Sequence, residues 1–338
     1  MREPPELADA AIITALQSHF GIIVKTLVFL LLGDDSSSFA YCAEATDGVT
    51  YFAKLRSEYG FSVSSLAVPQ FLHTQGVPHV LAPLLTISQS LWVNVEGYAL
   101  SLYPFIVGGQ ATDVGLTERQ WGELGATMRI VHATALTPGL VRNLGIRSET
   151  YIPSRRNVIA DIQAVISRSD LSTPAESDLA AFWHAKSDII DTVVARADSL
   201  ARQLRQAAPG PLVLCHADLH TWNVLVDGDG QIWIVDWDET ILAPKERDLI
   251  FVVGGIGTNL VRPHETDYFL QEYGDGAINS TALAYYRFAW AVQDLAAYGE
   301  QVFFMPGLSE HARREAVRGI MSLFEPGNIV DIAFASQG

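Results

Sequence analysis

The sequence predicts an α+β fold in two lobes, an N-terminal lobe built on an antiparallel β-sheet and a larger, mainly α-helical C-terminal lobe. Short apolar runs separated by turn residues dominate the first third of the chain, whereas helical periodicity begins at Thr117. Between the two patterns, Tyr103-Pro104-Phe105-Ile106 is typical of a linker at a lobe boundary. We therefore expect an N-terminal lobe over residues 1–106, with its hinge at 103–106, and a C-terminal lobe over residues 107–338.

The N-terminal lobe is predicted to begin with a helix and to continue with strands. The helix spans Ala8 to His19, and the strands span Val24 to Leu32, Phe39 to Ala45, Thr50 to Leu55 and Tyr98 to Phe105. A further helix-like segment, Val63 to His73, is interrupted by Pro69 and carries no acidic residue. In the second lobe the predicted helices are Gln120 to His132, Ser177 to Gln206, Glu265 to Glu272, Thr281 to Glu300 and Glu310 to Phe324.

Composition restricts the function classes. The chain of 338 residues is 49% hydrophobic and 18% charged, as expected of a folded globular protein. Its formal net charge of −16 argues against a nucleic-acid partner and favours a small neutral or cationic one, although acidity also serves solubility. Two cysteines, Cys42 and Cys215, are too few for a disulfide framework or a Cys-rich zinc site.

Targeting signals are not expected either. The longest apolar run, Leu27 to Leu32, is far shorter than the roughly 20 residues that a membrane span requires. The first residues lack the basic region and apolar core of a secretory signal. We therefore expect no membrane partner and a cytoplasmic location, and the sequence leaves the oligomeric state open.

The most informative motif runs from Cys215 to Asn223 and is followed by Ile234 to Asp238. It places Asn223 five positions after Asp218 and Asp236 thirteen positions after Asn223. In kinases this pattern supplies a base for the substrate hydroxyl and two Mg²⁺ ligands beside the nucleotide phosphates. The alternative is purely structural: a turn cap, a strand end and a loop start.

The segment between the two halves of this motif predicts a β-hairpin. A four-residue loop, Asp227-Gly228-Asp229-Gly230, sets Val226 opposite Gln231. Asn223 then faces Ile234, and Asp236 is its diagonal neighbour at about 7–8 Å. Oxygen ligands that lean together from this separation can share a Mg²⁺ at roughly 2.0–2.1 Å each. For His216 a structural role is at least as well supported as a catalytic one, and His220 receives no assignment.

Two upstream elements fit a nucleotide site. Lys54, in the apolar strand Tyr51 to Leu55, is predicted to pair the α and β phosphates, although a lysine in such a strand often only reaches for solvent. The loop Gly33 to Ser38, with Asp35, Ser36 and Ser37, is placed to cover the phosphates through its backbone N–H groups. An ordinary hairpin turn is the alternative for this loop. The backbone groups of the linker that contains Tyr103, Phe105 and Ile106 are predicted to hydrogen-bond adenine, and the alternative for this segment is a plain strand followed by a turn before Gly108.

These residues resemble the aminoglycoside phosphotransferase family, which shares the protein-kinase fold. The resemblance extends over nearly the whole length of the chain. Its most specific stretches are Lys25 to Tyr41, Tyr51 to Leu55, Tyr103 to Ile106, Cys215 to Val226, Ile234 to Gly257 and Phe324 to Ala335. The resemblance implies a bilobal kinase-like fold and ATP- and Mg²⁺-dependent phosphorylation of a hydroxyl on an aminocyclitol or aminoglycoside antibiotic, spectinomycin first among them. Such an enzyme confers resistance to a small cationic drug.

The resemblance also implies residue roles. Asp218 is the catalytic base and contacts the substrate, Asn223 and Asp236 are metal ligands, Lys54 pairs the phosphates, and Asp248 braces the catalytic loop. Because such antibiotics carry ammonium groups and hydroxyls, acidic side chains are expected to bind them. The substrate candidates are Asp238, Glu239 and Asp294.

The chain departs from the kinase pattern in two places. The helix glutamate that usually pairs with the strand lysine is missing, which leaves Glu58 or the nucleotide itself as a partner for Lys54, and the loop after residue 32 is poor in glycine. Two other functions therefore stay open. One is a kinase for another aminoglycoside or for a metabolite such as choline or a sugar, and the other is a nucleotide-binding pseudokinase that regulates a partner.

Overall fold

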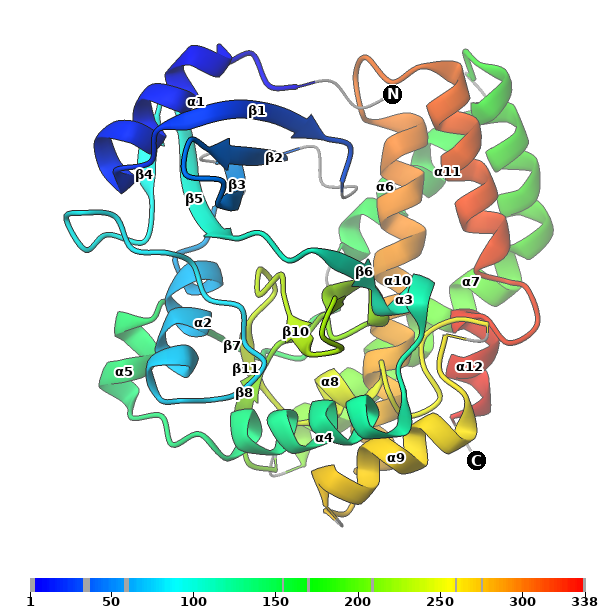
Figure 1. Cartoon of the computed structure of the whole chain (residues 1–338). Coiled ribbons are helices and arrows are strands. Elements are labelled where there is room, and N and C mark those ends of the chain that lie inside the picture. Colours follow the sequence, from blue (N-terminus) through cyan, green and yellow to red (C-terminus); the bar gives the residue numbers. More distant parts are fainter. Residues whose placement is uncertain are drawn as a thin grey trace. The chain divides into compact units, whose positions relative to one another are not determined.

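The computed structural model (Figure 1) describes the chain except for short segments. The described residues are 4–32, 37–57, 61–153, 155–168, 171–207, 210–258, 260–274 and 276–336. The helices are α1 Asp9–Ala15, α2 Ser64–Thr74, α3 Ala111–Val114, α4 Glu118–Ala133, α5 Pro138–Asn143, α6 Arg156–Arg168, α7 Pro174–Gln206, α8 Glu246–Leu249, α9 Pro263–Tyr273, α10 Ser280–Phe303, α11 Glu310–Ser322 and α12 Ile329–Ala335. The strands are β1 Val24–Leu30, β2 Ser38–Ala45, β3 Thr50–Ser57, β4 Val93–Val95, β5 Tyr98–Pro104, β6 Gly108–Gln110, β7 Arg147–Ser148, β8 Val213–Cys215, β9 Val224–Asp227, β10 Ile232–Ile234 and β11 Ile241–Ala243.

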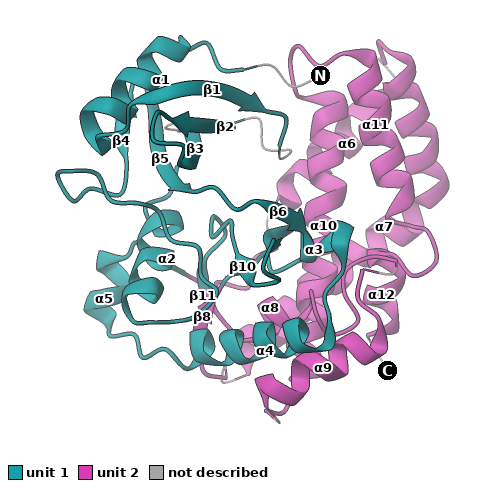
Figure 2. Cartoon of the chain, viewed as in Figure 1, with its two compact units in different colours: residues 1–147, 216–241 teal, residues 148–215, 242–338 magenta. Residues whose placement is uncertain are grey.

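The chain divides into two compact units (Figure 2). Unit 1 contains residues 1–147 and 216–241, and unit 2 contains residues 148–215 and 242–338. The segment that carries Asp218, Asn223 and Asp236 thus belongs to the same compact unit as the N-terminal strands. This division follows compactness, and the functional boundary expected after residue 106 stays a prediction.

Unit 1 is built on an antiparallel sheet of five strands in the order β1-β2-β3-β5-β4. Along β3, the buried Ala53 and Leu55 alternate with the partly exposed Phe52, Lys54 and Arg56, because successive side chains point to opposite faces. One face packs with α1 into a core that includes Ile12, Leu16, Tyr41, Leu55 and Leu100, all of them at most 1% exposed. The sheet and the helix-rich remainder confirm the predicted α+β class.

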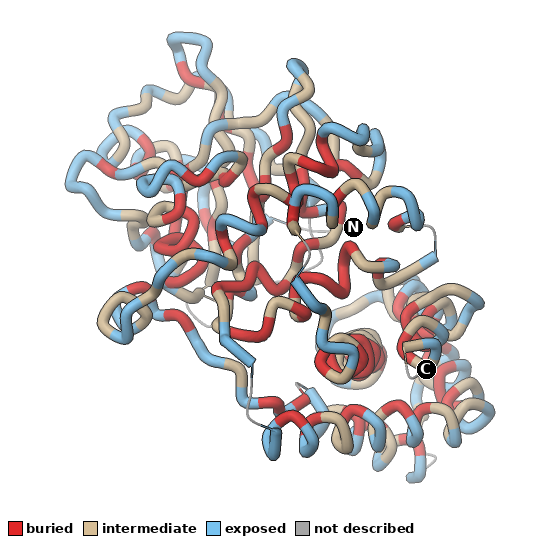
Figure 3. Tube along the Cα trace, turned by 90° about the horizontal axis from the view of Figure 1, so that it is seen from below, coloured by how far each residue is buried: buried red, intermediate tan, exposed pale blue. Residues whose placement is uncertain are grey.

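Unit 2 is organised around α10, which packs against α6, α7, α11 and α12. Helix α10 is apolar over most of its circumference, as expected of a central helix, whereas α7 is amphipathic. The alternation of buried and exposed residues along the outer helices is visible as bands in Figure 3. Within the described ranges, no helix combines the length and the apolar character needed to cross a membrane.

The hairpin β9–β10 exists, but the predicted register is wrong by one residue. Val226 pairs with Ile232 rather than with Gln231, because Asp227 still belongs to strand β9. The loop is therefore Gly228–Gly230, a three-residue loop whose last residue takes the left-handed conformation, with φ 77° at Gly230. The N–H of Asp227 donates to the carbonyl of Gln231 at 3.0 Å and closes the loop.

This register places Asn223 opposite Val235, whose N–H donates to the Asn223 carbonyl at 3.0 Å. Asp236 therefore lies one residue after Val235, the cross-strand partner of Asn223. The predicted relation, with Asp236 two residues after that partner and diagonal to Asn223, is wrong. Asn223 itself ends a short 3₁₀ turn, Thr221–Asn223, rather than opening a strand. The two side chains come from adjacent positions on the two arms of the hairpin.

Gly108 of strand β6 lies very close to the backbone of β9. A Cβ built on Gly108 lies 1.9 Å from the carbonyl oxygen of Val226, so only glycine fits this pairing. We expect Gly108→Ala to lower the free energy of unfolding by about 1–3 kcal/mol through overpacking. Gly228→Ala in the hairpin loop is the control, because a Cβ at Gly228 meets no atom within 4 Å. Equal urea midpoints for the two variants would contradict this account of β6.

Candidate active site

The segment between β8 and β9, referred to below as the 216–223 loop, is held by the side chain of His216. This side chain is fully buried. Its Nδ1 accepts from the Asp218 N–H at 3.2 Å, so Nε2 carries the proton and donates to the Val235 carbonyl at 2.9 Å. His216 therefore links the loop to the start of the Asp236 segment, which favours the structural role over the catalytic one.

A second set of contacts holds the loop from β6 and α3. The Gln110 amide donates to the Trp222 carbonyl at 3.1 Å, and the Thr112 and Thr221 hydroxyls lie 2.6 Å apart. Ala217 adopts a left-handed conformation, with φ 69°. This backbone reversal turns the chain between the buried His216 and the partly exposed Asp218.

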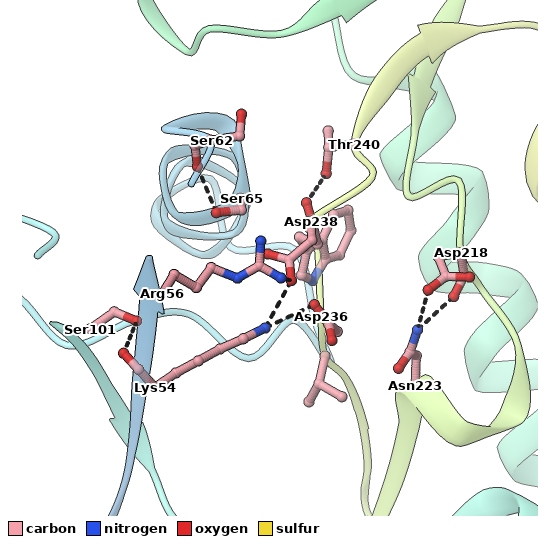
Figure 4. Close-up of polar contacts among 12 residues, drawn as sticks. Lys54, Arg56, Ser62, Ser65, Ser101, Asp218, Asn223, Asp236, Asp238 and Thr240 are labelled. Atoms are coloured by element: carbon pink, nitrogen blue, oxygen red, sulfur yellow. Dashed lines mark hydrogen bonds and ion pairs between the residues drawn. The ribbon is translucent and has the colours of Figure 1, made fainter. Parts of the chain in front are cut away.

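The carboxylate of Asp218 is oriented by two neighbours in the loop. The Asn223 amide Nδ2 donates to Asp218 Oδ2 at 2.9 Å and to the Asp218 carbonyl at 2.9 Å. His220 Nε2 lies 3.2 Å from Asp218 Oδ1. The Asp218 side chain is 24% exposed to solvent, so a small molecule can reach it. Because Nδ2 of Asn223 makes these contacts, its amide oxygen points away from Asp218 (Figure 4).

The segment after β10 presents two carboxylates on one side of a buried tryptophan. Trp237 is 2% exposed, and its ring packs on the His216 ring at 4.6 Å between centroids. Asp236 has a φ of 62°, a left-handed conformation that Asp adopts more readily than most residues. The Thr240 hydroxyl donates to the Trp237 carbonyl at 2.6 Å and closes the following turn. Asp236 and Asp238 flank Trp237 and extend away from the core.

Both carboxylates contact Lys54 of strand β3 (Figure 4). Lys54 Nζ lies 3.0 Å from Asp236 Oδ1 and 2.8 Å from Asp238 Oδ2, and Arg56 also donates to Asp238 Oδ2. Lys54 and Arg56 are two residues apart, so their side chains leave β3 on the same face, opposite the buried Ala53 and Leu55. Lys54 and Arg56, two residues apart on β3, thus form ion pairs with Asp236 and Asp238, which are also two residues apart.

The charges in this cluster shift one another's pKa values. Burial disfavours the charged form of Lys54, but Asp236 and Asp238 outweigh it and raise the pKa of the ammonium. Burial also opposes ionisation of Asp236, but the attraction of Lys54 and Arg56, together with hydrogen bonds from Lys54 and Asp238, outweighs it and lowers the pKa of Asp236. Burial, helped by repulsion from Asp236, raises the pKa of Asp238 to about 7 against the attraction of Lys54. Lys54 and Asp236 are therefore an ion pair at neutral pH.

The donors present fit a magnesium ion. The Asn223 amide oxygen and the Asp236 carboxylate are hard oxygen ligands of the kind that Mg²⁺ prefers. The Asp236 side chain is 42% exposed, and its lowered pKa keeps it anionic. These two residues are the ones that would hold the metal.

The other predicted residues lie in different places. Asp35 and Ser36 are outside the described residues, as is Glu58, whereas Ser37 precedes β2 and its carbonyl accepts from the Ser57 N–H at 2.9 Å. Tyr103 lies on β5 opposite Phe52, Phe105 donates its N–H to the Thr50 carbonyl, and Ile106 follows. Glu239 is half-exposed at 3.5 Å from Arg147, whereas Asp294 and Asp248 lie on α10 and α8 of unit 2. Their predicted roles stay predictions.

Sequence reasoning missed Arg56 and the contact of His220 with Asp218. A signal for Arg56 was present, because Lys54 and Arg56 share the two-residue spacing of Asp236 and Asp238. The contact itself joins residues 182 positions apart, which no local pattern reports. His220 lies two residues after Asp218, and only the 3₁₀ turn that follows it brings its ring back to the carboxylate.

Trp237 is the packing anchor of this site. We expect Trp237→Ala to lower the free energy of unfolding by about 3–5 kcal/mol, because the large ring is buried and leaves a cavity. Trp222→Ala is the matched control, since Trp222 is 39% exposed. Urea unfolding followed by circular dichroism measures both. A loss for Trp237→Ala no larger than that for Trp222→Ala would contradict the anchoring role.

An antiparallel five-stranded sheet with a strand lysine, a loop aspartate and asparagine, and a second aspartate after a hairpin defines a phosphotransferase of the kinase-like class. The chain belongs to the phosphotransferase enzyme family, whose model matches residues 45–291. A search of curated proteins gave no match.

Solved structures extend this result. The chain is similar to spectinomycin phosphotransferase APH(9)-Ia in complex with ADP and spectinomycin, with 31% identity, a TM-score of 0.87 and coverage of 98% of this chain and 99% of that one. The AMP-bound complex of the same enzyme gives 31% identity and a TM-score of 0.83, over 99% and 100% of the two chains. Choline kinase LicA from Streptococcus pneumoniae, at 16% identity and a TM-score of 0.55 over 93% and 99%, shares the fold.

Proposed function

We propose that this protein is an ATP- and Mg²⁺-dependent O-phosphotransferase that phosphorylates a hydroxyl of spectinomycin or a closely similar aminocyclitol, and so confers resistance. The observation that carries the proposal is the pair of contacts Asp218–Asn223 and Lys54–Asp236 within one compact unit. The similarity at 31% identity to an enzyme with ADP and spectinomycin bound supports the choice of acceptor.

Asp218 is proposed to orient the acceptor hydroxyl and to receive its proton. Asn223 and His220 hold the two carboxylate oxygens in place, so little orientational freedom is left to lose when the acceptor binds. His216 fixes the backbone of the same loop through the Asp218 N–H. Three neighbouring side chains, those of Asn223, His220 and His216, thus set the position of the Asp218 carboxylate.

Asn223 and Asp236 would hold Mg²⁺, whose charge, when it is bound, neutralises that of the nucleotide phosphates. Lys54 is proposed to contact the α and β phosphates. Its raised pKa keeps it cationic, so it can attract an anion even while Asp236 and Asp238 lie beside it. Catalysis then consists of positioning and of electrostatic stabilisation.

The nucleotide base is proposed to lie against the backbone of residues 103–106, and the loop that includes Ser37 is proposed to cover the phosphates. For the acceptor, Glu239 and Asp294 are the proposed partners of its ammonium groups. The net charge of −16 favours the approach of a cationic drug.

An acceptor panel tests the proposal. ADP release is followed with ATP, Mg²⁺ and one of spectinomycin, another aminoglycoside, choline or no acceptor. We expect spectinomycin to stimulate release well above the control and above the other compounds. Stimulation by choline alone, or by another aminoglycoside alone, would assign that compound as the acceptor in place of spectinomycin. If none of the compounds stimulates ADP release, the result would support the pseudokinase alternative.

A further inference from the structure

Lys54 lacks the partner that a strand lysine has in protein kinases, a glutamate on the following helix. Helix α2, which follows β3, has the sequence SSLAVPQFLHT and contains no acidic residue. The ammonium of Lys54 nevertheless lies within hydrogen-bonding distance of two carboxylates, those of Asp236 and Asp238. Among the described residues, these two carboxylates are the candidates for the role that the helix glutamate has in protein kinases.

We propose that Asp238 is the positioning residue for Lys54, that Arg56 holds Asp238 in place, and that this pair replaces the missing helix glutamate. The inference rests on the proposed function in one respect, the use of Lys54 for nucleotide phosphates. It assigns Asp238 to the nucleotide side of the reaction instead of to the acceptor.

Exposure separates the two carboxylates. The Asp238 side chain is 17% exposed, close to the 15% of Lys54 and the 13% of Arg56, whereas that of Asp236 is 42% exposed. Asp236 is thus the carboxylate open to a ligand, and it is the one assigned to the metal. Asp238 Oδ2 already accepts from both cations, so an acceptor ammonium could bind this oxygen only by competing with Lys54 and Arg56.

Arg56 supplies the second reason. The same oxygen of Asp238 accepts from both Lys54 Nζ and Arg56, so the carboxylate is fixed from two sides. A charge-assisted pair of this kind is stronger than a neutral hydrogen bond and restricts direction as well. Lys54 is therefore held even when Asp236 is engaged elsewhere.

The backbone on both sides is held by neighbouring elements, as a positioning role requires. Lys54 and Arg56 lie in the middle of the sheet, with β2 on one side of β3 and β5 on the other. Asp238 follows the buried Trp237, and the hydroxyl of Thr240 closes the turn around it. Neither partner therefore depends on a mobile surface side chain for its location.

A double-mutant cycle on nucleotide affinity tests the proposal. The Kd for ATP with Mg²⁺ is measured by titration with a fluorescent ATP analogue for the wild type, Asp238→Asn, Lys54→Met and the double variant. We expect each single change to weaken binding about tenfold. The double variant should bind no more weakly than Lys54→Met, because Asp238 acts through Lys54. Asp229→Asn, a change in the exposed hairpin loop, is the control and should match the wild type.

Two results overturn the proposal. The first is an ATP Kd in the double variant that is increased by the product of the two single-variant factors, and the second is an unchanged ATP Kd for Asp238→Asn. An increased KM for spectinomycin, accompanied by an unchanged ATP Kd, would return Asp238 to the acceptor site. If Asp238→Asn does not fold, Arg56→Gln replaces it. That variant should also weaken ATP binding, without adding to Lys54→Met, and an unchanged Kd would contradict the role of Arg56.

The readout separates this inference from the proposed function. ATP titration requires no acceptor. If the wild type phosphorylates none of the compounds, the proposed reaction is contradicted, but the double-mutant cycle on ATP affinity can still be measured and interpreted. A wild type that binds no ATP would overturn both.

Discussion

Asp218→Ala is expected to lower kcat for phosphoryl transfer by about 10²–10⁴-fold, because the acceptor hydroxyl loses its base and its orienting group. The affinity for ATP with Mg²⁺ should stay close to that of the wild type. In the structure Asp218 contacts Asn223 and His220, whereas the Lys54 cluster is formed by other side chains. A loss in kcat at constant ATP affinity is the signature of an interaction made with the reacting groups.

The matched control is Asp229→Ala, which removes an exposed carboxylate eleven positions further along the chain. It should leave both kcat and ATP affinity unchanged. Kinetics with saturating ATP and varied acceptor, combined with direct ATP titration, give both quantities. If Asp218→Ala keeps near-wild-type turnover, the assignment of the base is wrong.

Asp236→Asn is expected to remove most of the metal-dependent affinity for ATP, by about 100-fold or more, because even residues outside the ligand shell change metal affinity by 10–100-fold. Asparagine is preferable to alanine here. It tolerates the left-handed backbone at residue 236, where φ is 62°, and it leaves the shape of the side chain intact. The loss then reports the missing charge and not a rearranged turn.

The measurement is ATP titration at several Mg²⁺ concentrations, with Asp229→Asn as the control. The wild type should bind more tightly as Mg²⁺ rises, whereas Asp236→Asn should show little dependence. An Asp236→Asn variant whose ATP affinity follows Mg²⁺ as in the wild type would exclude Asp236 as a ligand.

Local patterns predicted much of this molecule. Short apolar runs between turn residues located β1, β2, β3 and β5 to within about two residues, because runs of this kind bounded by turn residues are typical of strands. The helix expected at Ala8 to His19 continues beyond α1 only as a π-helical turn, Leu16–Phe20, which ends at the left-handed Gly21. Helix α6 was missed, although Ile159, Ile162 and Ile166 share one buried face.

The hairpin register shows where local patterns fail. Four turn-forming residues in a row suggested a four-residue loop, yet the Asp227 carboxylate accepts from the N–H groups of Asp229 and Gln231 and so retains Asp227 in the strand. A one-residue slip moves side chains to the other face, so the relation between Asn223 and Asp236 changed with it. The types of residue in the loop could not show that hydrogen bonds to the Asp227 side chain would shorten the loop by one residue.

The candidate site divides in the same way. The types and spacing of Asp218, Asn223 and Asp236 are local in sequence, and the hairpin between them is short, so their proximity could be predicted. The partner of Lys54 could not, because it is separated from Lys54 by 184 positions and replaces a residue that was expected on a helix. Contacts of this kind depend on how the sheet and the hairpin meet inside unit 1.

The measurement that tests the central claim most directly is mass spectrometry of spectinomycin after incubation with ATP, Mg²⁺ and the protein. Wild type and Asp218→Ala are compared at equal concentration, and a reaction without Mg²⁺ serves as a blank. We expect spectinomycin to gain one phosphate group with the wild type, and to remain unmodified with Asp218→Ala and in the blank. Unmodified spectinomycin after prolonged incubation with folded, ATP-binding wild-type protein would contradict the account.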